Sequence, residues 1–337
     1  MNREFGYIIV TDYIEANTGK DVSDALQKLI LDNPNRTIYF PDGEYVLAKP
    51  VCTPANPKHS VALQLSTYAV LKAADGWSDE EAMIRLGAAE PFNDINTIGS
   101  NYSFKGGIID GNGVASGISI DSGRETLIRE VSIKHTQIGL RVKYGANNGS
   151  SDCDIEDVNI VGNGKAGSIG VLVEGFDNTF TNMRIASVQF GFQLKGAGNF
   201  LRNIHPLFIF TEELSKVYKE SCAFQELGGR NWYNICYSDQ FAVGFKISDW
   251  DKSTYSDCFC FWYTPGGEKQ VGFECRGKFN SIIRGSSISF HSGSKPENNA
   301  YITVKEPGGT GIIEAPLTND AAMVDKTYKD YLVGRVI

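Results

Sequence analysis

The side chains with the widest range of acid–base chemistry gather between Asn203 and Asp239. This stretch contains the imidazole of His205 and the adjacent carboxyl groups of Glu212 and Glu213. Imidazoles and carboxylates are the groups that proteins most often use to donate and remove protons. We therefore take Asp239, Glu213, Glu212 and His205 as candidate catalytic residues.

Cations and aromatic rings near these residues are candidates for substrate binding. A guanidinium group forms paired hydrogen bonds with a carboxylate, so Arg184 and Arg230 suit an acidic ligand. An aromatic ring offers a flat apolar surface on which a ring-shaped ligand can stack. The aromatic candidates are Trp232, Tyr233, Tyr237, Trp262 and Tyr263.

Two carboxyl groups on one face would suit hydrolysis of a glycosidic bond. One acts as a general acid and the other as base or nucleophile, and their separation sets the stereochemistry. Asp239 with Glu213 or Glu212 is the pair that we expect. His205 and the two glutamates also have structural alternatives, since His205 precedes Pro206 in a turn-like context and the glutamates can be solvated loop charges.

Elimination from an acidic sugar is the second chemistry that the residues allow. It needs a base that removes the proton beside the carboxyl group and a cation that stabilises the resulting negative charge. His205, Tyr237 or Tyr233 would be the base, with Arg184 or Arg230 as the stabilising cation. Hydrolysis ranks ahead of elimination, and both stay open.

A glycine repeat predicts the elements that position these residues. The tetrad glycine, apolar, any residue, apolar recurs at intervals of 21 to 31 residues, and one interval of 53 fits two repeats. Repeats of this period are typical of solenoids. The tetrads begin at Gly117, Gly139, Gly170, Gly191, Gly244 and Gly272.

A polar residue followed by a short alternating strand forms a second repeated column. Asp and Asn suit a tight turn because they accept left-handed backbone angles, and alternation places every second side chain in a core. We predict an all-β, right-handed parallel β-helix in which Ile133, Ile160 and Ile185 stack inside. The polar column is Glu130, Asp157, Asn182, Asn203, Asn234 and Asp257.

The same alternation predicts an exterior stripe of outward-facing side chains, made of Ser132, Asn159, Arg184, His205, Cys236 and Phe259. Asp239 and Trp262 lie just beyond this stripe. Trp232 and Trp262 could instead be buried in the core.

The N-terminal region predicts a cap for the β-helix. The stretch Asp21 to Leu31 places Val22, Ala25, Leu26, Leu29 and Ile30 on one stripe of a helix. A strand over Thr37 to Phe40 follows. We expect a single domain over residues 1–337, made of a cap and first strands (1–50), coils (51–304) with an insertion at about 205–231 that forms one wall of a cleft, and a C-terminal cap or tail (305–337).

The stretch DVSDALQKLILDNPNRTIYFPDGEYVL, residues 21–47, resembles the opening of the pectate-lyase-like (pectin-lyase-like) superfamily of polysaccharide-acting β-helix proteins. Coils of the same style extend to about Val304. The resemblance implies a carbohydrate-active enzyme, either a glycoside hydrolase or a polysaccharide lyase. A non-catalytic glycan-binding protein of phage tailspike-like or adhesin type, associating as a homotrimer, is the alternative. The NTD, DD, GHG and RIK segments of polygalacturonases are absent, as is the acidic cluster of calcium-dependent pectate lyases.

Composition limits the partners. The net charge of −8 and the lack of a basic block disfavour nucleic acid, and no apolar stretch is long enough to span a membrane. Seven cysteines without paired spacing predict reduced core thiols, and we expect no metal and no cofactor. The N-terminus does not read as a signal peptide, which leaves a cytoplasmic or virion-associated location open.

Overall fold

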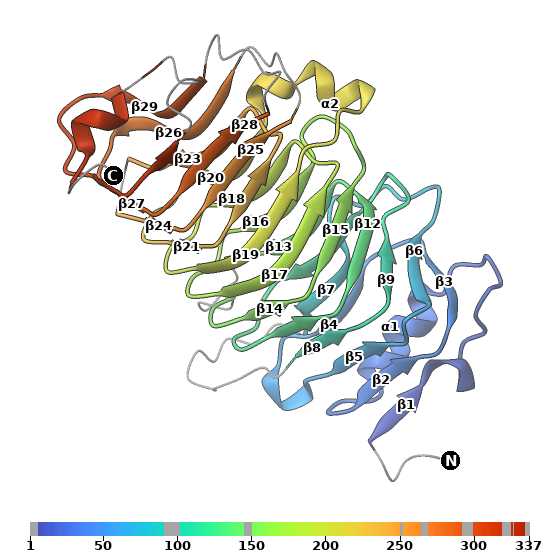
Figure 1. Ribbon diagram of the computed structural model, residues 1–337. Coiled ribbons are helices and arrows are strands. Elements are labelled where there is room, and N and C mark those ends of the chain that lie inside the picture. The colour runs from blue at the N-terminus through green and yellow to red at the C-terminus, as the bar shows by residue number, and fades with distance from the viewer. Residues whose placement is uncertain are drawn as a thin grey trace. The chain divides into compact units, whose positions relative to one another are not determined.

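The computed structural model describes residues 6–90, 102–144, 150–249, 252–263, 269–291, 299–318, 325 and 327–333. Parallel strands stacked coil on coil make up most of it (Figure 1), which confirms the predicted β-helix. The chain divides into two compact units, Met1–Asn163 with Glu174–Thr179 (unit 1) and Gly164–Val173 with Phe180–Ile337 (unit 2). No helix within the described ranges is long and apolar enough to cross a membrane.

In unit 1, strand β1 (Tyr7–Ile9) precedes helix α1 (Ser23–Leu31), and each of the coils that follow supplies one strand to sheet B and two to sheet A. Sheet A contains β1 (Tyr7–Ile9), β2 (Thr37–Phe40), β3 (Gly43–Leu47), β5 (Ala62–Leu65), β6 (Ala69–Ala73), β8 (Ser103–Lys105), β9 (Ile108–Asp110), β11 (Leu127–Arg129), β12 (Ser132–Thr136), β14 (Asp154–Glu156) and β15 (Asn159–Gly162). Sheet B contains β4 (Val51–Pro54), β7 (Ala82–Ala89), β10 (Ser116–Ile120) and β13 (Ile138–Val142).

Unit 2 continues with coils of the same kind, except that its first two strands of sheet A each run through the corner of their coil without a break. Helix α2 (Glu212–Lys216) lies between β19 (Phe200–Leu207) and β20 (Cys222–Glu226). The strands of sheet A in unit 2 are β17 (Thr179–Ala186), β19 (Phe200–Leu207), β21 (Trp232–Asn234), β22 (Tyr237–Asp239), β24 (Thr254–Ser256), β25 (Phe259–Trp262), β27 (Ile282–Arg284), β28 (Ser287–Phe290), β30 (Ile312–Glu314) and β31 (Leu317–Thr318). Its strands of sheet B are β16 (Ile169–Val173), β18 (Phe190–Leu194), β20 (Cys222–Glu226), β23 (Val243–Ile247), β26 (Gln270–Lys278) and β29 (Asn299–Glu306).

The two strands that a coil gives to sheet A meet at a residue with left-handed backbone angles. Glu130, Asp157, Asn182, Asn203 and Asp257 occupy this corner with φ between 53° and 58°, as the polar column predicts. The column is wrong at Asn234, because the left-handed residue of that coil is Ile235, with φ of 54°. The strands before the corner, such as β11 and β21, were not predicted from the sequence. Each has only three residues, too few to show an alternation of apolar and polar side chains.

Aromatic rings fill the core of unit 2. Phe192, Phe224, Phe245 and Phe273 stack from coil to coil at 6.0, 4.7 and 5.0 Å between ring centres. β20 pairs with β18 and β23, which confirms that the long glycine interval holds two coils. Most of the expected insertion is therefore regular, since it includes β20 as well as α2.

Helix α1 covers the first strand of sheet B in unit 1. Leu26, Leu29 and Ile30 are buried as predicted, whereas Ala25 is exposed. The Gln27 side chain donates from Nε2 to the Cys52 carbonyl at 2.9 Å and accepts from the Cys52 N–H at 2.8 Å. The edge of β4 is thus paired by the cap instead of being left open.

Candidate functional site

His205, Tyr237 and Asp239 come together on the exterior of sheet A in unit 2. Leu207 of β19 pairs with Asp239 of β22, so His205 lies opposite Tyr237 in the adjacent coil. Their rings stack with centres 4.1 Å apart and planes 16° apart. Two of the candidate catalytic residues, His205 and Asp239, thus lie on the same face of sheet A.

The polar atoms of this cluster face one another. His205 Nε2 lies 3.6 Å from Asp239 Oδ2, with side chains 27% and 18% exposed. Nε2 is buried and makes no hydrogen bond with any described residue. Burial raises the pKa of Tyr237, and Asp239, which accepts a hydrogen bond from the Tyr237 hydroxyl, raises it further. The tyrosine therefore stays protonated at neutral pH.

Arg184 and Phe259 lie on the same exterior face. Arg184 is exposed, and its Nη1 donates to the carbonyls of Met183 and Asn203 at 3.0 and 3.3 Å. Phe259 stacks on Tyr237 with ring centres 5.0 Å apart. The stack of His205, Tyr237 and Phe259 runs across three coils, with a cation available in the same unit.

Glu212 and Glu213 lie on helix α2 and are held by another partner. Both carboxylates form ion pairs with Lys216, at 3.3 and 2.7 Å. Thr211 caps the helix by accepting from the Leu214 N–H. Among the described contacts, neither glutamate meets Asp239, so the expected pair of carboxyl groups for hydrolysis is not assembled.

One residue of the predicted exterior stripe and two candidate ligand-binding residues point into the core. Cys236, Tyr233 and Trp262 are buried, with Trp262 fully so, and the Trp262 indole donates to the Phe241 carbonyl. The prediction counted outward positions from Asn234, whereas the corner lies at Ile235, so Cys236 was placed one residue out of register. Phe261, not Trp262, is the partner of Asp239 in the next coil. Tyr233 and Trp262 are therefore excluded from direct contact with a ligand.

The remaining predicted residues are exposed but lie away from the cluster. Trp232 starts β21, before the corner, and stacks on Phe200 at 4.5 Å; the two are 42% and 47% exposed. Arg230 is exposed in the turn that precedes β21. Tyr263 follows β25 and contacts the ring of His291. The described contacts do not join any of the three to His205, Tyr237 or Asp239.

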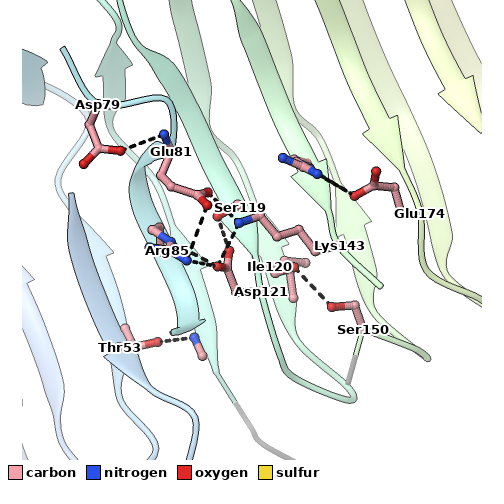
Figure 2. Close-up of polar contacts among 12 residues, drawn as sticks. Thr53, Asp79, Glu81, Arg85, Ser119, Ile120, Asp121, Lys143, Ser150 and Glu174 are labelled. Carbon is pink, nitrogen blue, oxygen red and sulfur yellow. Dashed lines mark hydrogen bonds and ion pairs between the residues drawn. The ribbon is translucent and has the colours of Figure 1, made fainter. Parts of the chain in front are cut away.

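A charged cluster on sheet B of unit 1 was not found from the sequence. Figure 2 shows Glu81, Arg85 and Lys143 pointing toward Asp121. Asp121 Oδ2 accepts from Arg85 Nη2 at 2.5 Å and from Lys143 Nζ at 3.1 Å, and Lys143 also meets Glu81 at 2.5 Å. Burial acts to raise the pKa of Asp121, but hydrogen bonds from Arg85 and Ser119 and the charge of Lys143 lower it on balance.

A second group that the sequence did not reveal is the buried carboxyl group of Glu226, at the end of β20. It accepts hydrogen bonds from Asn231 at 2.8 Å, from Ser253 at 2.5 Å and from Tyr255 at 2.8 Å. Burial raises its pKa more than these bonds lower it. All seven cysteines are free thiols, and six of them are buried, as predicted. In the described part of the chain, no three His, Cys, Asp or Glu residues are placed to hold a metal ion.

Comparison with known proteins identifies the fold but no family by sequence. No family model and no curated protein matches the chain. Among solved structures, the tailspike protein of E. coli bacteriophage HK620 in complex with a pentasaccharide has a TM-score of 0.63 at 12% identity, over 93% of this chain and 65% of that one. The tailspike protein gp49 of Acinetobacter baumannii bacteriophage Fri1, a capsular polysaccharide depolymerase, has a TM-score of 0.59 at 10% identity.

The match to Fri1 gp49 covers 98% of this chain and 62% of that one, so the chain spans about two thirds of either tailspike. Another solved structure matches over nearly all of its own chain. The A-module of the mannuronan C-5 epimerase AlgE4 of Azotobacter vinelandii has a TM-score of 0.54 at 13% identity, over 90% of this chain and 99% of that one. The fold that the pectate-lyase-like resemblance implies is thereby confirmed at the structural level.

Proposed function

We propose that the chain, a polysaccharide-acting β-helix, binds an acidic polysaccharide on the exterior of sheet A in unit 2 and cleaves it by β-elimination. The grouping of His205, Tyr237 and Asp239 carries the proposal. The shared fold supports a glycan as the ligand, since proteins with this fold include a tailspike bound to a pentasaccharide and a capsular polysaccharide depolymerase.

His205 is the base in this mechanism. Its Nε2 faces the Asp239 carboxylate at 3.6 Å, a looser contact than a hydrogen bond, of the kind that tightens in a substrate complex. With the Nε2 proton held toward Asp239, the lone pair of Nδ1 takes the proton from the carbon beside the sugar carboxyl group. The Asp239 carboxylate then stabilises the imidazolium that forms.

Tyr237 and Arg184 complete the elimination. The raised pKa of Tyr237 keeps its hydroxyl protonated, so it can give that proton to the oxygen that leaves when the C–O bond breaks. The exposed Arg184 stabilises the negative charge that develops on the sugar carboxyl group. The products are an unsaturated sugar end and a new reducing end, and the proton taken from carbon returns to Tyr237 through solvent.

Tyr237→Phe separates elimination from hydrolysis. It keeps the ring stack and removes the proton donor, so we expect kcat/KM to fall by about 10²-fold or more. The matched control is Glu213→Gln, which removes a carboxylate required only by the hydrolytic pair and should leave activity unchanged. Absorbance of the unsaturated product and new reducing ends are both recorded on acidic and neutral polysaccharides. Loss of activity in Glu213→Gln with full activity in Tyr237→Phe would contradict the elimination.

Binding without cleavage is the second candidate function, and one observation favours it. The stacked pair of Phe200 and Trp232 is exposed outside the cluster and provides apolar surface for a sugar chain. Under this function, the wild-type chain binds a polysaccharide without forming new ends, and Trp232→Ala weakens the binding. Cleavage by the wild-type chain would exclude it.

A further inference from the structure

The left-handed corner at Ile235 holds a residue type that suits neither the backbone nor the surroundings. A β-branched side chain at positive φ is a genuine outlier, because its Cβ crowds the backbone. The equivalent corners hold Asn203 before it and Asp257 after it, whose side chains suit this conformation. Ile235 is also 49% exposed, so packing in the core does not compensate for the strain.

The coil, not the side chain, imposes the left-handed conformation. The Ile235 N–H donates to the Ser256 carbonyl at 3.0 Å, and the Asp257 N–H makes the equivalent bond to Arg284 at 2.9 Å. An asparagine at this corner would do more for the fold, as Asn203 shows by donating from Nδ2 to Asn182 Oδ1 at 2.8 Å. Folding therefore does not explain the isoleucine. Strain that persists at an exposed position points to function.

The position of Ile235 indicates what would contact it. It follows Trp232 by three residues and precedes Tyr237 by two, so its Cα lies within about 11 Å and about 7 Å of theirs. Trp232 and Tyr237 both face outward. A glycan held at the His205, Tyr237 and Asp239 cluster and continuing toward Trp232 would pass over this corner. The hydroxyl groups of such a glycan are not stabilised by contact with an isoleucine side chain, whereas a methyl group on the glycan would bury apolar surface against it.

We propose that Ile235 is a specificity-determining residue that packs against the methyl group of an acetyl ester on the polysaccharide. The inference rests on the proposed function and names its substrate as an acetylated uronate polymer. Removing one apolar contact of this size weakens binding by about tenfold. The strain at Ile235 is retained for that contact, at the expense of stability.

Ile235→Asn tests the inference because two properties should change in opposite directions. We expect its thermal midpoint to rise by about 2 °C, since the strain is relieved. We expect its affinity for O-acetylated alginate or O-acetylated polygalacturonate to fall by about tenfold, and its affinity for the alkali-deacetylated polymers to equal that of the wild-type chain. Asp257→Asn, at the same corner of the next coil, is the matched control and should leave the discrimination intact.

Two results would overturn the inference while leaving the proposed function in place. One is wild-type affinity of Ile235→Asn for the acetylated polymers, and the other is an equal loss on acetylated and deacetylated polymers. A wild-type chain that neither binds nor cleaves any of these polymers would overturn the inference together with the proposed function. The thermal unfolding transition of Ile235→Asn also shows that this variant is folded.

Discussion

Glu226 links the stability of unit 2 to pH. Burial raises its pKa in the folded chain, so the folded chain binds this proton more readily than the unfolded chain does. Its contribution to stability is complete below the ordinary glutamate pKa of about 4.3 and is lost as the pH rises through the folded value. We expect the free energy of unfolding of Glu226→Gln, relative to wild type, to increase as the pH rises from about 4 to about 7.

Urea denaturation at a series of pH values measures this difference. The matched control is Glu212→Gln, because Glu212 is highly exposed on α2 and its described partner is the exposed Lys216. Its free energy of unfolding should stay close to that of the wild type, because the ion pair that it loses is exposed. A pH-independent difference for Glu226→Gln would contradict the role of burial.

Single residues show where sequence reasoning was limited. The polar column correctly predicted the left-handed corners at Asn182, Asn203 and Asp257. It failed where Asn234 stands one residue before the corner and Ile235 occupies it. The residue type alone cannot reveal such a corner, because hydrogen bonds to neighbouring coils can hold an unfavourable residue in the left-handed conformation. One misplaced corner then moved Cys236 to the wrong face.

At the scale of elements, helix α1 protects the edge of β4 through Gln27. Gln27→Ala removes both side-chain bonds to the Cys52 backbone and leaves a polar edge unpaired. We expect the free energy of unfolding to fall by about 2 kcal/mol. Chemical denaturation measures the change, and light scattering measures any added tendency to aggregate. Lys28→Ala, on the exposed face of the same helix, should have little effect, and an equal loss in both variants would contradict the capping role.

The charged cluster of Figure 2 joins strands β7 and β10 in unit 1. Asp121→Asn removes one of the two carboxylates that pair with Arg85 and Lys143 in a mostly buried position, and Glu81 remains as the other. We expect a loss of about 2 kcal/mol in the free energy of unfolding at neutral pH, because the variant loses the charged acceptor of hydrogen bonds from both cations. Because the pKa of Asp121 is lowered, its contribution is present above about pH 4 and disappears as the pH falls through the folded value.

Denaturation at neutral and acidic pH should therefore show the Asp121→Asn deficit shrinking in acid. Ser132→Ala, on the exterior of sheet A in the same unit, is the control and should have little effect at either pH. A deficit that stays constant into acid would contradict the lowered pKa.

Elements with strong periodicity were predictable, and contacts between distant elements were not. The helix at 21–31, the strand at 37–40 and the glycine tetrads of sheet B all read from local patterns. The cluster around Asp121 joins residues up to 62 positions apart, so no local pattern marks it. Glu213 appeared to be a partner for Asp239 until the structure showed its ion pair with Lys216.

At the scale of the whole molecule, the repeat predicted the fold because every coil repeats the same core positions. Whether residues 1–337 behave as one domain stays a prediction. So does the homotrimer, which we propose from the tailspike-like fold. Light scattering after size exclusion should give three times the mass of one chain, and a stable monomer would contradict the trimer and weaken the tailspike-like interpretation.

The most direct test of the proposed elimination is an assay of the wild-type chain on acidic polysaccharides. It records two signals, the absorbance of the unsaturated product and the number of new reducing ends. We expect both signals to appear together on at least one uronate polymer and both to disappear in Asp239→Asn and Tyr237→Phe. New reducing ends without the absorbance would show hydrolysis instead. The absence of both signals from every uronate polymer would show that unit 2 does not cleave such a chain.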